Sequence, residues 1–423
     1  MTYTKKKINL NFKTDIPFVI VVVMVLLTAL TGLFNQTVLS LGILMCCAIL
    51  MFYDKLYLGF PFMLFYSIFY GVVFGIAVAS LYSAMLIGNA ILRMSNESNL
   101  RLKCLLPLLV YLIYLILIML PQSASVFIAL LIDVIGGFVL VSDLLKKTDA
   151  IKNFFKTYAV VCLCSFFSGI LVGNFVGDEY NETRFLATFE DPNYMGFFFT
   201  IAIFALVTLK LFDKRIRFIM VISLYLMMLT TLSVTAIVAN IALWMFYLIM
   251  MKKIKWWSIF VVVLVAMILV SLFNYGLNNQ DVPFLSDFAN RIDKKLVSLE
   301  AGDIDDVTTN RTELAARHFE YYINLPVFNL LFGGIAVNSR YLDPRIASSA
   351  HNEYIDMLLN VGVVGAVIMF GYFISNMVSY VKTYRENKEE KYLFLIMAKT
   401  VWMCYAMTLT VFIDFRFMLL FLL

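Results

Sequence analysis

The chain of 423 residues predicts an all-α, polytopic membrane helical bundle, and three observations support this class. Hydrophobic residues make up 62% of the sequence, only 14% are charged, and the mean hydropathy is +0.89, so the chain cannot present a soluble surface. Repeated apolar runs approach the roughly 20 residues needed to cross a hydrocarbon core. The runs are continuous rather than alternating, which favours helices over a barrel.

The apolar runs predict about 12–13 membrane helices. The first run, 16–33, has no small-residue cleavage site after it and leads straight into another span, which indicates a retained helix rather than a removed signal peptide. Region 58–92 is long enough for two short crossings or for one tilted helix with a re-entrant piece, and we favour two crossings. The remaining predicted spans are 103–120, 122–141, 154–176, 194–211, 216–232, 234–250, 256–273, 353–380 and 392–413.

The distribution of Lys and Arg predicts the orientation, because cytoplasmic loops are enriched in these residues. Lysines 5 to 7 indicate a cytoplasmic N-terminus, and basic clusters follow at 93–103, 146–156, 210–217, 252–255 and 382–391. The net charge of +5 is therefore explained by membrane topology, and we expect no nucleic-acid partner. Two loops then fall on the outer face of the membrane, at 173–193 and within 274–350.

Three regions follow from this topology. We predict an N-terminal transmembrane bundle at 1–273 with the small outer loop 173–193, an extracytoplasmic loop at 274–350 with short amphipathic helices, and C-terminal transmembrane helices at 351–423. All six cysteines lie within or beside apolar runs, which favours buried thiols over disulfides or metal ligands. The acidic residues Asp303, Asp305 and Asp306 lack the spacing of a calcium loop, so we predict a solvated loop tip and no metal site.

The first outer loop contains an arginine and a helix-start signal. Pro192 suits the first turn of a helix, and Asp191 is placed to cap its free N–H groups. Arg184 has two interpretations. Its side chain could extend to lipid headgroups, or its guanidinium could bind a phosphate through a fork of donors.

The second outer loop predicts a short helix over 311–324. Asn310 is placed to cap this helix with Glu313 at its third position, as in a capping box. Arg311 and His318 would share one face, while Glu313 and Arg317 would form an i, i+4 ion pair on another. The helix could lie at the membrane surface with His318 as an interfacial residue, or it could contribute to a site.

The third polar element is His351-Asn352-Glu353-Tyr354, directly before a long apolar helix. The positive end of the helix dipole disfavours the imidazolium form of His351. A neutral imidazole accepts a proton, so His351 is a candidate base. The alternative is a histidine that forms only local hydrogen bonds at a helix cap.

The order of these elements matches a known pattern. Arg184 precedes F-x-D-P-N-x-x-G at 189–196. The second outer loop then contains N-R-x-x-L, L-P and L-F-G-G between residues 310 and 334, and H-N-E-Y-I-D-x-L-x-x-x-G-x-x-G follows at 351–365. This succession resembles the O-antigen polymerase and O-antigen ligase superfamily. One departure is the stretch 232–235, Leu-Ser-Val-Thr, where many relatives have a Ser-Arg pair.

The resemblance implies a multi-pass enzyme of the bacterial cytoplasmic (inner) membrane whose active site faces outward. Such enzymes transfer an oligosaccharide from a polyprenyl diphosphate carrier to an acceptor hydroxyl, without a metal or other cofactor. Here Arg184 and Arg311 would bind the donor diphosphate and His351 would act as general base. The supporting residues would be Arg317, His318, Asn352 and Asp191. The implied partners are the bilayer, the lipid-linked donor, a glycan acceptor, a flippase and a chain-length regulator.

Three functions remain open at this point. A polymerase joins repeat units into a capsule, exopolysaccharide or O-antigen, whereas a ligase transfers a finished glycan to a lipid, wall or protein acceptor. We favour a polymerase because the outer loops are modest in size. A transporter or flippase of lipid-linked sugars would instead be expected to pair ionisable groups such as Asp133 and Lys399 in one cavity.

Overall fold

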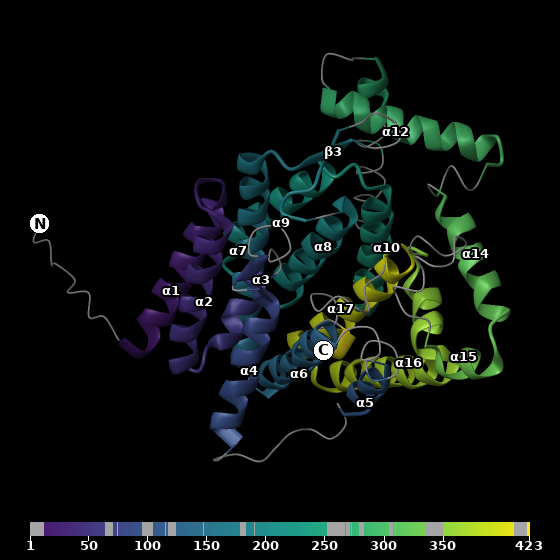
Figure 1. Cartoon of the computed structure of the whole chain (residues 1–423). Coiled ribbons are helices and arrows are strands. Elements are labelled where there is room, and N and C mark those ends of the chain that lie inside the picture. The colour runs from purple at the N-terminus through teal and green to yellow at the C-terminus, as the bar shows by residue number, and fades with distance from the viewer. Residues whose placement is uncertain are drawn as a thin grey trace, which may run out of the picture.

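The protein is a bundle of helices (Figure 1). The computed structural model describes residues 12–409 and 421–423, except 64–70, 74, 95–104, 115, 117–123, 147, 178–182, 190, 252–266, 268–270, 272, 279–282, 304–307, 309 and 335–349. Within these residues, three helical stretches are long and apolar enough to cross a membrane: Phe127–Leu145, Asp149–Val172 and Glu353–Asn387. Five shorter apolar helices accompany them. The predicted class, an all-α membrane bundle, is confirmed.

The N-terminal half contains seven α-helices among the described residues: α1 (Phe12–Ala29), α2 (Gln36–Phe52), α3 (Phe60–Met63), α4 (Val78–Met94), α5 (Leu105–Tyr114), α6 (Ala124–Lys146) and α7 (Thr148–Val172). Two 3-10 turns, Thr31–Leu33 and Leu56–Gly59, and two antiparallel ribbons complete it. The ribbons are β1 (Val72–Val73) with β2 (Ile76–Ala77), and β3 (Phe175–Gly177) with β4 (Thr183–Phe185). In region 58–92 the described part has one helix of near-span length, α4, so the second crossing stays a prediction that depends on residues 64–70.

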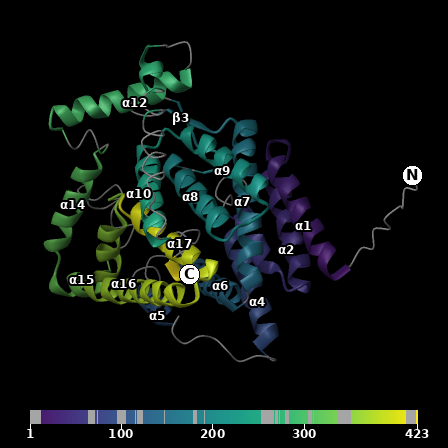
Figure 2. The ribbon, with the colours of Figure 1, turned by 180° about the vertical axis from the view of Figure 1, so that it is seen from behind.

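The C-terminal half contains α8 (Pro192–Thr208), α9 (Lys214–Leu229), α10 (Val234–Met250), α12 (Pro283–Glu300), α14 (Arg311–Ile323), α15 (Val327–Phe332), α16 (Glu353–Asn387) and α17 (Glu390–Ala406). In both views of the ribbon, α12, α14 and α15 lie on the side of the molecule opposite α1 and α2 (Figures 1 and 2). Most of the predicted span 256–273 lies outside the described residues.

Helix α8 forms the centre of the bundle. It is apolar on every side, which is the pattern of a helix surrounded by others, and it packs against α7, α9, α10 and α17. A buried polar contact also joins three helices, since Asn240 of α10 donates to the Thr200 hydroxyl of α8 at 2.8 Å and that hydroxyl lies 3.1 Å from the Tyr405 hydroxyl of α17. These contacts join the middle of α8 to α10 and α17.

Helix α16 is bent rather than straight. Its backbone leaves helical geometry at Gly362, where φ is 66° and ψ is −177°, and the parts before and after this residue run in different directions (Figure 1). The apolar pattern predicted one continuous span at 353–380. The kink lies where the backbone of Leu331 and Gly333 crosses α16 at Gly362.

Candidate active site

The starts of three helices converge in the structure. Asp191 precedes α8, Arg311 begins α14, and His351 lies two residues before α16. Both Asp191 and Arg311 lie close enough to His351 to change its pKa electrostatically. Residues that are 40 to 160 positions apart in the sequence therefore form one cluster.

Asp191 caps α8 as predicted. Its carboxylate accepts a hydrogen bond from the Asn193 backbone N–H at 2.6 Å, and Pro192 occupies the first turn. The Asn193 side chain in turn accepts from the Ser233 hydroxyl at 2.6 Å, and Ser233 caps α10 by accepting from the Ala236 N–H. Ser233 thus ties the start of α10 to the start of α8.

Arg184 lies in the short ribbon next to this cap. Its backbone is part of β4 and pairs with Val176 of β3, and the neighbouring Phe185 N–H donates to the Thr230 carbonyl at 3.3 Å. The Arg184 side chain lies outside the described part of the chain. Its role in phosphate binding therefore stays a prediction.

Helix α14 begins at Arg311, as predicted, but the predicted capping box at Asn310 is wrong. Asn310 has a left-handed backbone with φ of 58° and makes no side-chain cap hydrogen bond. An N-cap side chain reaches the first turn from an extended backbone, which this φ does not provide. The Thr308 hydroxyl instead accepts from the Thr312 N–H at 3.3 Å.

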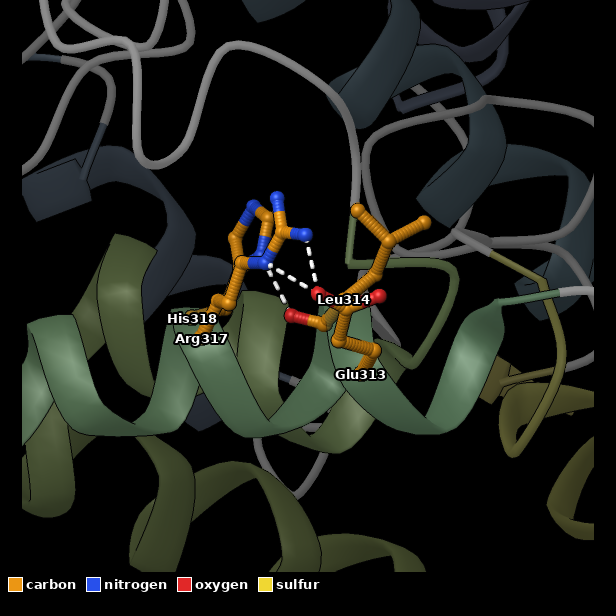
Figure 3. A network of polar contacts seen from close by, with 4 residues as sticks. All are labelled: Glu313, Leu314, Arg317 and His318. Atoms are coloured by element: carbon orange, nitrogen blue, oxygen red, sulfur yellow. Dashed lines mark hydrogen bonds and ion pairs between the residues drawn. The ribbon is translucent and has the colours of Figure 1, made fainter. Parts of the chain in front are cut away.

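The two supporting residues predicted on α14 lie in different environments (Figure 3). Arg317 is exposed and donates from Nε to the Glu313 carboxylate at 3.1 Å, so the predicted i, i+4 pair is confirmed. His318 is fully buried, with Nδ1 2.8 Å from the Leu314 carbonyl oxygen. Because a carbonyl only accepts, Nδ1 is the donor in this contact.

Two arginines meet near the start of α14. Burial lowers the pKa of Arg311, the Asp191 carboxylate opposes that shift, and the nearby Arg291 adds to it. Arg291 belongs to α12 and is only 6% exposed. Sequence reasoning did not select Arg291 for the site, because it is surrounded by charged neighbours in a helix that looks solvated.

His351 has the electrostatics of a neutral base. Burial lowers its pKa below 6.5, and the positive charge of Arg311 lowers it further, while the carboxylates of Asp191 and Asp356 oppose the shift. Its imidazole is therefore neutral at pH 7 and can accept a proton. The backbone at His351 has a positive φ of 47°, an uncommon conformation of the kind that clusters at functional sites.

The first turns of α16 carry a buried polar stripe. Asn352 caps the helix by accepting from the N–H groups of Tyr354 and Ile355 at 3.1 and 3.4 Å. Glu353, Asp356 and Asn360 then follow at helical spacing, and none is more than 1% exposed. The sequence analysis did not select Glu353 and Asp356 as site residues. The spacing of three and four between Glu353, Asp356 and Asn360 could have indicated a polar stripe on one side of this apolar helix.

Two loop glycines hold the start of α16 in place. The Gly334 N–H donates to the Asn360 carbonyl at 3.2 Å. A Cβ at Gly333 would lie 2.3 Å from that carbonyl oxygen, and a Cβ at Gly362 would lie 2.4 Å from the Leu331 carbonyl. The L-F-G-G segment of the outer loop thus crosses α16 in direct backbone contact, which joins the second and third sequence motifs.

The donors in the described site suit an anion better than a metal ion. Within the described residues, no group of three or more His, Cys, Asp or Glu side chains is placed to hold a metal. Guanidinium groups such as those of Arg291 and Arg311 are suited to phosphate oxygens, because they offer paired N–H donors. The imidazole of His351, whose pKa is lowered, adds a proton acceptor to the same cluster.

Comparison with known proteins adds one finding. Residues 218–370 match the family model described as O-antigen ligase. This region contains Arg291, Arg311, His318, His351 and the glycine contact, whereas Asp191 and Arg184 lie before it. The match confirms the resemblance predicted from the motifs. No curated protein and no solved structure matches the chain.

Proposed function

We propose that this integral membrane protein polymerises oligosaccharide repeat units carried on polyprenyl diphosphate, because residues 218–370 match the family model described as O-antigen ligase. The product would be a surface polysaccharide such as a capsule, an exopolysaccharide or O-antigen. The observation that carries this proposal is the convergence of His351 with Arg311 and Asp191 in one partly buried cluster.

The transfer step assigns a role to each charge in the cluster. The acceptor hydroxyl oxygen attacks the anomeric carbon of the donor glycan, the bond from that carbon to the diphosphate oxygen breaks, and polyprenyl diphosphate leaves. His351 takes the hydroxyl proton, and a positioned base of this kind contributes roughly 10²- to 10⁴-fold. The carboxylates of Asp191 and Asp356 then stabilise the imidazolium that forms.

Arg311 is placed to stabilise the departing diphosphate. Negative charge grows on that group as the glycosidic bond breaks, and preorganised cations have their largest effect on such developing charge. Arg291 would add a second guanidinium to the same anion, and Arg184 would approach from the first outer loop. The leaving group is good enough that the proposal needs no metal.

The cellular setting of the proposal follows from the substrate. The site would face outward across the bacterial cytoplasmic membrane, with the N-terminus inside. A flippase would supply the lipid-linked donor at that face, and a chain-length regulator would limit the product.

Ligation is the second candidate, because the matching family model is described as O-antigen ligase. The same cluster would then transfer a finished glycan to a lipid, wall or protein acceptor. Transport has less support. Among the described residues, Asp133 accepts from the Ser80 hydroxyl of α4, whereas Lys399 donates to the Phe421 carbonyl at 2.9 Å and lies over the Phe373 ring.

The test uses the full-length protein in liposomes with polyprenyl diphosphate-linked repeat units, and the products are separated on a gel. We expect a ladder with the wild type and none with His351→Ala or Arg311→Ala, each of which should insert normally. Arg317→Ala is the matched control and should keep the ladder, because its guanidinium pairs with Glu313 on the exposed face.

The alternative outcomes separate the functions. A full ladder with His351→Ala would remove the proposed base. A single transfer that occurs only when a foreign acceptor is added would identify a ligase. Movement of the donor across the bilayer without any transfer would identify a transporter.

A further inference from the structure

The outer loop exposes an apolar surface outside the candidate membrane spans. We call it the loop apolar face, and it consists of Phe319, Ile323, Val327, Phe328, Leu331 and Phe332, which are 41% to 70% exposed. The rings of Phe328 and Phe332 lie 5.2 Å apart on one side of α15. Contiguous apolar surface of this kind marks an interaction with a partner or a membrane.

The three sides of α14 have different characters. One side carries the buried residues His318 and Tyr322 and the partly buried Arg311. A second side is exposed and charged, with Glu313, Arg317 and Glu320. Phe319 and Ile323 occupy the remaining exposed side, at the i, i+4 spacing that places them on one stripe.

The loop apolar face is fixed relative to a membrane helix. The Tyr322 hydroxyl donates to the Leu330 carbonyl, which joins α14 to α15. The α15 end is then held against α16 by the backbone contact between Gly334 and Asn360. These two contacts connect α14 to α15 and α15 to α16, so the loop apolar face has a fixed position beside the kink of α16.

The exposed side chains of α16 indicate the environment of the loop apolar face. Directly after the kink, α16 exposes Val363, Val364 and Val367 at 42%, 39% and 65%. This helix is a candidate span, and the exposed apolar side chains of a span contact lipid. The backbone of Leu331 and Gly333 lies against Gly362, so the end of α15 lies beside the first of these exposed valines.

We propose that the loop apolar face inserts into the acyl chains of the outer leaflet. Helices with one apolar side and one charged side bind in this way at the boundary between headgroups and acyl chains. Insertion would place Arg311 and His318 beside the headgroup layer, where the diphosphate of a lipid-linked molecule lies. The lipid contact itself does not depend on the proposed glycosyl transfer.

The test compares one position on the face with one on the charged side. In full-length protein whose native cysteines are replaced, Phe328→Cys and Glu313→Cys are each labelled with an environment-sensitive fluorophore and reconstituted into phosphatidylcholine and phosphatidylglycerol vesicles. We expect nitroxide-labelled lipids to quench the label at 328 several-fold more than the label at 313. Aqueous iodide should quench in the reverse order.

Two results would overturn the proposal. Equal iodide quenching at both positions would place the face in water, and protection of position 328 from both quenchers would place it under protein, such as a second copy of the chain. If replacing the native cysteines harms folding, the wild-type protein can be tested by photolabelling instead. A lipid-soluble photoreactive probe should then label residues 319–332 as well as α16, and labelling of α16 alone would contradict the insertion.

Discussion

Replacing Gly362 by alanine tests whether the bent start of α16 is required for the site. At φ of 66° and ψ of −177°, Gly362 occupies a region of backbone space that is essentially restricted to glycine. An alanine there costs of order 1–3 kcal/mol in backbone strain. Its Cβ would also lie 2.4 Å from the Leu331 carbonyl carbon and oxygen, which are backbone atoms of the crossing segment.

These two effects set the expected magnitude. Straightening the helix would relieve the strain but would separate α15 from α16 and move His351 relative to Arg311. If the bent form is disfavoured by about 3 kcal/mol, its population relative to the straight form falls by roughly 100-fold. We therefore expect Gly362→Ala to lower the transfer rate in liposomes by about two orders of magnitude, together with the thermal stability in detergent.

A matched control lies nine residues further along the same helix. A Cβ at Gly371 meets nothing within 4 Å, and the backbone there is helical. Gly371→Ala should keep full transfer and gain roughly 0.5–1 kcal/mol of helix stability. Wild-type transfer and stability in Gly362→Ala would refute the reasoning, because the bend would then be dispensable. Loss in both variants would also refute it, because the effect would not be specific to the crossing.

Three further predictions concern the pH dependence of transfer and the stability of α14 and α16. In the proposed mechanism His351 acts when neutral and its pKa is lowered, so kcat/KM should be at its plateau at neutral pH and fall only at acidic pH. Asp191→Asn, which keeps a capping side chain, removes a charge that raises this pKa and should move that fall to still lower pH. Arg317→Ala should change thermal stability by no more than about 0.5 kcal/mol, because its pair with Glu313 is solvent-exposed. Asn352→Ala should destabilise the protein by about 1 kcal/mol, with recovery in Asn352→Asp, because the side chain caps α16.

Local signals in the sequence predicted local structure well. The Asp191-Pro192 pair predicted the start of α8, and the spacing of Glu313 and Arg317 predicted their ion pair. Each depends on atoms within one turn of a helix. The predicted cap at Asn310 was wrong because residue type alone indicated it. The backbone angle decides whether an N-cap side chain can reach the first turn, and the sequence does not give that angle.

Features that depend on tertiary contact could not be predicted in this way. Arg291 lies between charged residues in α12, and only packing in the folded chain buries it. Gly362 and Gly365 looked like small residues within a straight span, whereas Gly362 is the point at which a distant loop crosses the helix. Periodicity describes one segment at a time, so it does not report a contact between backbones that lie about 30 residues apart.

The Asp191 carboxylate connects the fold to the proposed chemistry. One of its oxygens caps α8, and its negative charge acts to raise the pKa of both His351 and Arg311, against the lowering that burial causes. An asparagine or serine would satisfy the helix equally well, so capping alone does not require aspartate here. The additional requirement is a negative charge that keeps the imidazole basic enough to take a proton beside a cation. The same side chain therefore fixes the start of the central helix and sets the balance between the base and the anion-binding arginine.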